Sequence, residues 1–513
     1  VEQLRIPHGI PVITKADLAD PDWIELITEE LGSRLAVSPV SFEPPLVVSA
    51  VSGQGIEALR ERLRARLEGP AAAPVEDGFR MPIDRAFSLA GVGTVVTGTP
   101  WSGRLRIGDT VTILPGAGRE GRVRSLEAYG RPRSEAGPGA RTAVGLAGVE
   151  RADIARGDVL VAGDLPWRAT TALDVALELL PGAPPLKRRL RVRLHLGTAE
   201  VQGRLYPRGE PSAAGAGHAR IALEAEIVAR GGDRFVLRSY SPVATIGGGV
   251  VLDPMPPRRA PWPEGLADPD PARRATALIT RRSRGVATNE LPVLLGLPDR
   301  ECRVIAAGLR EVTAVGTRLV GKRLTAAMRD EAIRRVAEFH REQPSEKGMS
   351  LETLRKGLRG PLEVAEAVLS GMTRRGELVA ADGLVSTPGF VPRLADGDAV
   401  LDRVVNLLEQ AGLEPPTVEE LERQTGIPGL LTVLRFGARS GRVVGVESNR
   451  FFSSQILTNF LTLVRELASQ GPLTPPMVRE RTGLSRKYLI PLLEYADRAG
   501  VTRRVGEARV LNR

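Results

Sequence analysis

The sequence predicts a multidomain protein with a partial α/β domain, two β-barrels and then tandem winged-helix (α+β) modules. Three observations support this prediction. The spacing of apolar residues changes along the 513 residues from mixed strand and helix patterns, to short strands, to helices. A proline-rich stretch separates the strands from the helices. A glycine turn then recurs four times in the helical part.

The first 70 residues alternate between strand and helix patterns. Apolar residues predict strands at 9–14 and 46–49. Asp20 followed by Pro21 is typical of a helix start, because the carboxylate can cap the helix and proline fits its first turn. A second amphipathic helix pattern follows the later strand. The stretch is too short for a whole α/β domain, so we expect only the C-terminal part of one.

The next part of the chain changes to a period of two. Short β-branched runs between glycine and proline breaks predict two β-barrels, at 71–168 and 169–256. A joint between them is expected near 160–170. The exception to the strand pattern is 170–180, which is compatible with a helix.

A linker and an array of repeats complete the chain. Seven prolines between residues 253 and 272 predict a stiff linker at 257–272. Each repeat after it contains two helices, a glycine turn, a third helix and a hairpin, which is typical of winged-helix modules. The turn glycines are Gly296, Gly360, Gly426 and Gly483. The four expected modules span 273–324, 325–393, 394–453 and 454–513.

The composition favours a polyanionic partner without identifying it. The chain has 71 basic and 61 acidic residues, a net charge of +10. However, 65 of the basic residues are arginine, a skew that is typical of a GC-rich genome. The single cysteine, Cys302, excludes a disulfide framework and is expected in the core.

The sequence argues against a metal site, a catalytic site and a membrane location. The four histidines show no metal-ligand spacing, and no catalytic triad or carboxylate pair is evident. No apolar stretch is long enough for a membrane span, and no leader pattern is present. We therefore expect a cytoplasmic protein without a resident metal, a catalytic group or a membrane partner.

Two loops at predicted strand ends carry the pattern of a guanine site. They are Thr14-Lys15-Ala16-Asp17 and the loop that begins with Ser49-Ala50. Nucleotides bind at the carboxyl ends of strands in such sheets. The Asp17 carboxylate can accept hydrogen bonds from guanine N1 and N2, and the Lys15 stem can cover the base. Backbone N–H groups near Ser49 can meet the guanine oxygen; the alternative is an ordinary β–α loop.

The phosphate cradle of such a site is missing. GTPases hold the phosphates and Mg2+ with a G-x-x-x-x-G-K-[ST] loop. Gly316–Arg323 matches all but its last position, where Arg323 replaces the hydroxyl residue, and we expect it in a hairpin rather than between a strand and a helix. The sequence is therefore expected to begin within a GTP-binding domain, with 1–70 as its C-terminal part. On its own it should neither bind GTP and Mg2+ tightly nor hydrolyse GTP.

Motifs in the barrels and the helical array resemble one family. MPIDRAF at 81–87 followed by GVGTVVTG is similar to the second domain of elongation-factor-Tu-like translational GTPases. RFVLRSYSP at 234–242 followed by TIGGGV is similar to the third domain. With the TKAD loop and the winged helices, the chain resembles the selenocysteine-specific translation elongation factors. The resemblance implies delivery of selenocysteinyl-tRNA to ribosomes at recoded UGA codons, with GTP and Mg2+ as cofactors.

In that family the amino acid occupies a pocket on the second domain. The resemblance assigns to this pocket Asp84 and Arg85 of PIDRAF and Arg141 of PGARTAVGL. A selenol is more acidic than a hydroxyl, so guanidinium groups favour a selenolate over the neutral hydroxyl of serine. The alternative for Arg85 is a salt bridge with Asp84 at the rim of the barrel.

The last module carries the charge of an RNA-binding surface. Residues 455–513 hold ten basic and five acidic side chains, and their apolar stripe predicts a unit that folds on its own. The resemblance implies that this module binds an mRNA hairpin through phosphates and an unpaired base. A solvated basic face is the alternative. The expected RNA contacts are Arg486 and Lys487 at a helix start, and Arg503, Arg504 and Arg509 on the wing.

Two other functions remain open. Winged helices often bind DNA, but a DNA-binding regulator needs neither the barrels nor the TKAD loop. A general translational GTPase of another subfamily would share the barrels but not the helical array. The main prediction is a monomeric elongation factor whose partners are selenocysteinyl-tRNA, the hairpin of a selenoprotein mRNA and the ribosome.

Overall fold

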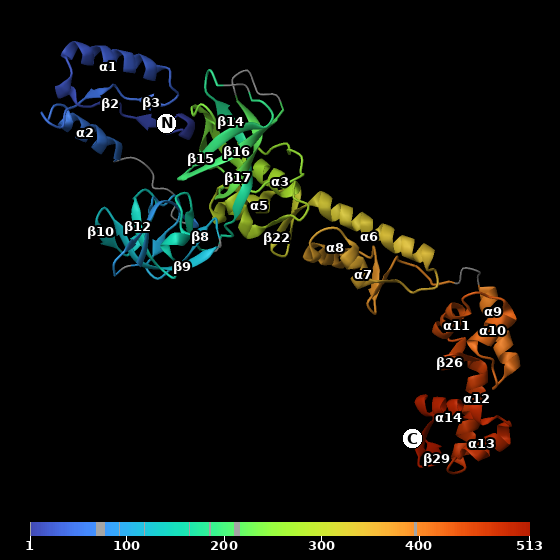
Figure 1. Cartoon of the computed structure of the whole chain (residues 1–513). Coiled ribbons are helices and arrows are strands. Elements are labelled where there is room, and N and C mark those ends of the chain that lie inside the picture. The colour runs from blue at the N-terminus through green and yellow to red at the C-terminus, as the bar shows by residue number, and fades with distance from the viewer. Residues whose placement is uncertain are drawn as a thin grey trace. The chain divides into compact units, whose positions relative to one another are not determined.

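The computed structural model describes residues 2–67, 77–91, 93–116, 118–163, 165–183, 186–209, 216–393 and 398–512. The chain divides into two compact units, Val1–Thr325 and Ala326–Arg513 (Figure 1). Two expected domain boundaries, at 70/71 and 393/394, lie outside the described residues. No helix in the described ranges combines the length and the hydropathy needed to cross a bilayer.

Small parallel strand pairs and two helices form the N-terminal part. Its elements are η1 (Glu2–Leu4), β1 (His8–Gly9), β2 (Val12–Ile13), η2 (Ala16–Leu18), α1 (Pro21–Ala36), β3 (Ser41–Phe42), β4 (Leu46–Val47) and α2 (Ile56–Leu67). The predicted start of α1 is confirmed, because the Asp20 carboxylate accepts a hydrogen bond from the backbone N–H of Asp22. The single strand expected at 9–14 is wrong. It is split at Pro11, which has no N–H to donate, so β1 pairs with β3 and β2 with β4.

The first barrel follows as a closed ring of six strands with β10 added at one edge. Its sheet order is β10-β9-β12-β6-β5-β13-β8, and β8 also pairs with β9, which closes the ring. Met81, Val96 and Leu160 are fully buried in its core. Its elements are β5 (Phe79–Leu89), β6 (Gly93–Gly98), β7 (Leu105–Arg106), β8 (Thr110–Leu114), β9 (Arg119–Ala128), β10 (Arg131–Arg133), β11 (Glu135–Ala136), β12 (Thr142–Ala147), η3 (Arg151–Asp153) and β13 (Val159–Ala162).

The second barrel is a closed six-stranded ring in the order β14-β17-β16-β15-β18-β19. The helical pattern at 170–180 is wrong, because these residues belong to β14, which pairs with both β17 and β19. Leu173, Val175 and Leu177 alternate into the core. The elements are β14 (Ala169–Leu179), β15 (Leu190–Leu196), β16 (Ala199–Arg208), β17 (Ala216–Val228), β18 (Arg234–Ser239) and β19 (Thr245–Asp253).

Buried ion pairs hold the two barrels together. Arg80 of the first barrel forms a bidentate pair with Asp233, with nitrogen–oxygen distances of 2.6 and 2.7 Å. Arg230 of the second barrel reaches back to Asp77 and also donates to the carbonyl oxygens of Pro292 and Leu297. All four charged side chains are less than a tenth exposed. Arg230 therefore links both barrels and the first winged helix.

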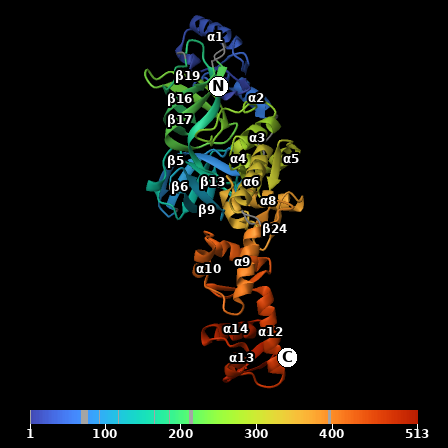
Figure 2. The same ribbon diagram turned by 90° about the vertical axis from the view of Figure 1, so that its right-hand side faces the viewer.

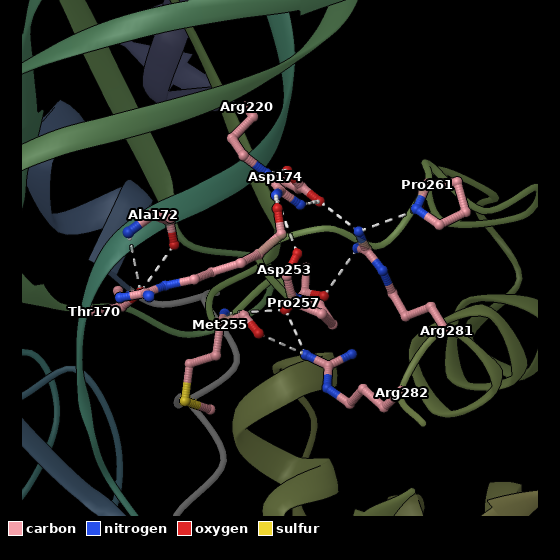
Figure 3. A network of polar contacts seen from close by, with 11 residues as sticks. Thr170, Ala172, Asp174, Arg220, Asp253, Met255, Pro257, Pro261, Arg281 and Arg282 are labelled. Atoms are coloured by element: carbon pink, nitrogen blue, oxygen red, sulfur yellow. Dashed lines mark hydrogen bonds and ion pairs between the residues drawn. The ribbon is translucent and has the colours of Figure 1, made fainter. Parts of the chain in front are cut away.

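The proline-rich stretch packs against its neighbours instead of spanning open solvent. Leu266 is fully buried and Trp262 packs in the same cluster, which joins the second barrel to the first winged helix. Asp270 caps the helix that begins at Pro271. Figure 3 shows Arg281 and Arg282 reaching the carboxylates of the barrel at this joint.

The described residues 271–393 and 398–512 form four modules, each with three helices followed by a hairpin. The predicted winged-helix array is confirmed, and Gly296, Gly426 and Gly483 end their helices in the left-handed conformation that glycine tolerates. The elements of modules 1 and 2 are α3 (Pro271–Thr280), β20 (Val286–Ala287), η4 (Thr288–Glu290), α4 (Leu291–Leu295), α5 (Asp299–Gly308), β21 (Val312–Val315), β22 (Arg318–Gly321), α6 (Lys322–Glu342), β23 (Met349–Ser350), α7 (Leu351–Gly357), α8 (Leu362–Arg374), β24 (Val379–Ala381) and β25 (Leu384–Ser386).

The hydrophobic core of module 4 extends into the hairpin of module 3, whose own helices form a separate cluster. Val446 and Phe452 from the hairpin of module 3 pack among the helices of module 4, and Figure 2 shows these helices grouped beside the chain end. The expectation that 455–513 folds on its own stays a prediction, and part of the core of this module lies outside that range. The elements are α9 (Asp398–Ala411), α10 (Val418–Thr425), α11 (Leu430–Arg439), β26 (Val443–Glu447), β27 (Arg450–Ser453), α12 (Ser454–Ser469), α13 (Pro475–Thr482), α14 (Arg486–Arg498), β28 (Thr502–Val505) and β29 (Ala508–Leu511).

Two smaller expectations concern single segments. Cys302 is buried in the core of module 1, as predicted, and burial raises the pKa of its thiol to about 12. Gly316–Arg323 lies partly in the β21–β22 hairpin, as expected. However, α6 starts directly at Lys322, so its end does lie between a strand and a helix. Because β22 joins α6 without a loop, the segment still cannot form a glycine-rich phosphate cradle.

Candidate functional site

Parallel pairing of β2 with β4 places the two predicted guanine loops at the same edge. Val12 pairs with Leu46 and Ile13 with Val47, so both strands end side by side. The Ala16 N–H donates to the Val48 carbonyl oxygen at 3.2 Å, which ties the loops together. The sequence-based juxtaposition of TKAD and the Ser49 loop is therefore present in the fold.

A buried serine fixes the aspartate of this edge. The Ser49 hydroxyl is buried and donates to Asp17 Oδ1 at 2.5 Å. The Ser49 hydroxyl oxygen also accepts hydrogen bonds from the backbone N–H groups of Val51 and Ser52, each at 3.2 Å. Asp17 itself is exposed, so its carboxylate is oriented from below and open to a ligand.

The remaining residues of the edge are exposed as well. Thr14, Lys15 and Ala50 all face solvent. Lys15 has a left-handed backbone, with φ 61°, at the start of η2, and its stem is free to cover a base. Within the described ranges, no group of three or more His, Cys, Asp or Glu side chains could hold a metal ion. These residues therefore fit a guanine base, but they supply neither phosphate nor Mg2+ ligands.

A β-bulge builds the second candidate site, on the first barrel. Ile83 pairs with Gly98 and Arg85 with Thr97, so Asp84 is the extra residue of β5. A bulge redirects the extra side chain relative to its neighbours. Here it turns the half-buried Asp84 toward β6 and the loop before β12.

Arg141 completes this cluster. Its Nε donates to Asp84 Oδ2 at 2.9 Å and its Nη2 to Asp84 Oδ1 at 2.8 Å. Nη2 also donates to the Thr97 hydroxyl at 3.0 Å, and that hydroxyl donates to Asp84 Oδ1 at 2.6 Å. The hydrogen bond from Arg141, with help from Thr97, lowers the pKa of Asp84 below its usual value despite partial burial. The same contact raises the pKa of Arg141.

Asp84 pairs with Arg141 and not with Arg85, contrary to the alternative role for Arg85. No hydrogen bond or ion pair joins Asp84 to Arg85 among the described residues. Arg85 is exposed and acts on Asp84 only through its charge. The three predicted residues are thus brought together, with Arg85 beside the pair rather than within it.

Thr97 is the residue of this cluster that the sequence analysis did not single out. It lies inside the quoted GTVVTG motif, where alternation with valine suggested only a barrel strand. A threonine that is only 7% exposed on a barrel strand needs a polar partner, but this burial is seen in the structure and not in the sequence.

The last module places four of its five predicted basic residues at the surface. Arg486 and Lys487 are exposed at the start of α14, where Ser485 makes no side-chain cap. Arg503 and Arg504 are exposed on β28. Lys487 lies 5.4 Å from the ring centre of Tyr488, and Arg450 of module 3 lies 4.8 Å from the same ring.

Arg509 does not belong to this surface. It is 4% exposed, and its Nε donates to Asp497 Oδ2 at 2.8 Å. Its backbone N–H and carbonyl oxygen both pair with Leu473 at 2.7 Å. The strand β29 therefore has β28 on one side and Leu473 on the other. The expectation that Arg509 points out from the wing is therefore wrong.

Comparison with protein families assigns four segments. The models match as Elongation factor Tu domain 2 at residues 93–161 and the beta-barrel domain of selenocysteine-specific elongation factors at 171–258. Two models described as winged helices of elongation factor SelB match at 333–386 and 465–511. The matched segments cover parts of both barrels, module 2 and module 4.

Relatives that align over nearly the whole chain carry the same family name as the matched segments. A selenocysteine-specific elongation factor from Desulfomicrobium baculatum is 28% identical over 99% of this chain and 84% of its own length. One from Escherichia coli (strain K12) is also 28% identical, over 97% of this chain and 81% of its own. The crystal structure of a bacterial selenocysteine-specific elongation factor, EF-Sec, shares the fold with a TM-score of 0.64 and 23% identity, covering 100% of this chain and 82% of its own.

Proposed function

The chain belongs to the SelB-type selenocysteine-specific elongation factors, and we propose that it delivers selenocysteinyl-tRNA to ribosomes at recoded UGA codons. Membership of this family implies a role with tRNA and the ribosome in translation. The observation that carries the finer proposal is the cluster on the first barrel. There Asp84 and Thr97 hold Arg141 beside the exposed Arg85.

The charge of this cluster distinguishes selenocysteine from serine. Two guanidinium groups face one carboxylate, so one positive charge is left uncompensated. A selenolate supplies the missing negative charge, whereas the serine hydroxyl leaves the imbalance in place. Hydrogen bonds to an ionised partner are roughly twice as strong as neutral ones, so the same donors favour selenocysteine.

We propose that Asp17 and the Ser49-Ala50 loop recognise the guanine base of GTP. Proteins of this family bind GTP together with Mg2+. The oriented Asp17 carboxylate can accept from both N1–H and N2–H of guanine, and adenine lacks this donor pair. The proposal assigns to these two loops contacts with the base only.

We propose that module 4 binds the hairpin of a selenoprotein mRNA. The exposed Arg486 and Lys487 at the helix start can contact phosphate together with the free N–H groups of α14. Arg503 and Arg504 extend the positive surface onto the wing. We further propose that the protein acts as a monomer in the cytoplasm, where ribosomes translate.

Competition between two aminoacylated forms of one tRNA tests the proposed pocket. The same tRNA carrying selenocysteine or serine is bound to the full-length protein in the presence of GTP, and both affinities are measured. We expect a preference for selenocysteine at neutral pH that falls when the selenol becomes protonated. Equal affinities at neutral pH would contradict the pocket.

A second competition tests the nucleic acid. A hairpin RNA with an unpaired base near its loop is compared with a duplex DNA of equal length. We expect the hairpin to bind more tightly, because RNA-binding surfaces read an unpaired, splayed-out base, which the DNA duplex does not offer. Equal binding of both would favour a DNA-binding winged-helix protein instead.

A further inference from the structure

Thr97 connects the two charged residues of the cluster on the first barrel. It lies on β6, between β5, which carries Asp84, and β12, which follows Arg141. Thr97 is only 7% exposed, whereas 53% of the Arg141 side chain is accessible. The exposed arginine therefore rests on a hydroxyl that belongs to the rigid barrel wall.

The hydrogen bonds of Arg141 leave one of its nitrogens open. A guanidinium has five N–H groups, one on Nε and two on each terminal nitrogen. Nε donates to Asp84 Oδ2, and Nη2 donates to both Asp84 Oδ1 and Thr97. No acceptor contacts Nη1 within the described part of the chain. Its two N–H groups are thus the donors that remain for a ligand.

We infer that Thr97 is a positioning residue that sets the selectivity for selenocysteine by fixing which edge of Arg141 faces the amino acid. Its hydroxyl accepts the second N–H of Nη2 and directs Nη1 toward the pocket. This inference rests on the proposed function, because it requires that the amino acid binds beside Arg141.

The hydroxyl adds a constraint that the ion pair lacks. A half-exposed arginine held only by a carboxylate can exchange a side-on for an end-on arrangement, and each presents different N–H groups to a ligand. Thr97 holds both partners at once, since it donates to Asp84 Oδ1 at 2.6 Å and accepts from Arg141 at 3.0 Å. A selenolate depends on directed, charge-assisted donors more than a neutral hydroxyl does. Loss of the constraint should therefore affect selenocysteine more than serine.

Two substitutions of Thr97 and one matched control test this inference. Thr97→Val keeps the shape and removes the hydroxyl, and Thr97→Ser keeps the hydroxyl. Thr94→Val is the control, because Thr94 lies on the same strand, is also 7% exposed, and donates to the Val149 carbonyl oxygen away from the cluster. The readout is the ratio of the affinities for selenocysteinyl-tRNA and seryl-tRNA in the presence of GTP.

We expect Thr97→Val to lower this ratio about five- to tenfold, the size of one net hydrogen bond. The affinity for seryl-tRNA should stay unchanged. Thr97→Ser should restore the ratio, and Thr94→Val should leave it as in the parent protein. Thr97→Ala is used in the same assay should the valine variant not fold. A ratio unchanged in Thr97→Val or Thr97→Ala would overturn the inference.

A second readout needs neither tRNA nor GTP. Arg141 and, to a smaller extent, Thr97 hold the pKa of Asp84 below its usual value. NMR titration of the Asp84 carboxyl should show this pKa rising in Thr97→Val and staying unchanged in Thr94→Val. Equal values in the two variants would mean that the hydroxyl does not hold the pair in solution.

Arg141→Ala separates failure of the inference from failure of the proposed function. If Arg141→Ala leaves the selectivity ratio unchanged, the pocket itself is misassigned. If Arg141→Ala abolishes the preference while Thr97→Val matches Thr94→Val, the pocket stands and the positioning role of Thr97 is wrong.

Discussion

Replacing Asp174 by alanine should loosen the first winged helix from the second barrel. Asp174 is fully buried and pairs with Arg220 through both oxygens, at 2.7 and 2.9 Å. It also accepts from Arg281 at 2.8 Å. Arg281 and Arg282 bind the second buried carboxylate, Asp253, at 3.0 and 2.7 Å (Figure 3). The cluster thus holds two carboxylates against three guanidinium groups.

The sign and size of the effect follow from this charge balance. Without Asp174, three guanidinium groups share one carboxylate, and Arg281 remains 1% exposed. Removing one partner of a buried ion pair costs about 3–5 kcal/mol. Arg281→Met should cost less, about 1–3 kcal/mol, because Asp174 keeps Arg220 and Asp253 keeps Arg282.

Hydrogen exchange measured by mass spectrometry on peptides from α3 and β19 resolves this local opening. Protection in Asp174→Ala should fall by roughly two to four orders of magnitude, since about 1.4 kcal/mol is tenfold. Arg303→Ala is the control, because Arg303 forms an exposed pair with Asp299, with 79% of the arginine side chain accessible. Such surface pairs contribute little. If Asp174→Ala and Arg303→Ala exchange alike, the network does not hold the joint.

Four further predictions concern the pocket and the C-terminal modules. Arg141→Ala should reduce the preference for selenocysteinyl- over seryl-tRNA about tenfold to a hundredfold, and an equal loss for both would make Arg141 structural. The double replacement of Arg503 and Arg504 by alanine should flatten the log–log salt dependence of hairpin binding by about one to two units. Arg509→Ala should leave that slope unchanged and lower the melting temperature instead, because its charge is buried against Asp497. Phe452→Ala should destabilise module 4 by about 3–5 kcal/mol, because Phe452 packs among its helices; a module 4 that melts as in the parent protein would contradict this.

The sequence predicts much of the architecture because apolar period and turn glycines are local signals. The first turn of α1 and the left-handed glycines of the modules each depend on a few adjacent residues. The division of the strand expected at 9–14 could not be predicted in this way. It depends on which partners pair on either side of Pro11, and those partners lie more than 30 residues away.

The candidate site on the first barrel shows the same limit. Asp84 and Arg141 could be assigned from motifs, but their pairing depends on a bulge that is recorded only in the register between β5 and β6. A shift of one residue turns a side chain to the other face of a sheet. The sequence left a salt bridge between Asp84 and the adjacent Arg85 as the alternative to the pocket, and the register that decides the partner of Asp84 is seen only in the structure. Thr97 was missed because its role exists only across three strands.

A count of charged residues does not show which of their side chains are buried. Arg504 and Arg509 face each other across the last hairpin, yet one is exposed and the other is sealed against Asp497 and Leu473. The difference arises from α14 and the segment before α13, which cover one side of β29. An arginine count over 455–513 therefore overestimates the surface that can reach phosphate.

The proposed RNA-binding surface of module 4 also depends on a residue outside that module. Arg450 of β27 is 5% exposed, pairs with Glu447 and lies over the ring of Tyr488. Tyr488 in turn adjoins Lys487 at the start of α14, and Arg498 at the other end of α14 donates to the Val446 carbonyl oxygen at 2.7 Å. Module 3 thus holds both ends of the helix that presents Arg486 and Lys487, so the position of these two side chains depends on both modules.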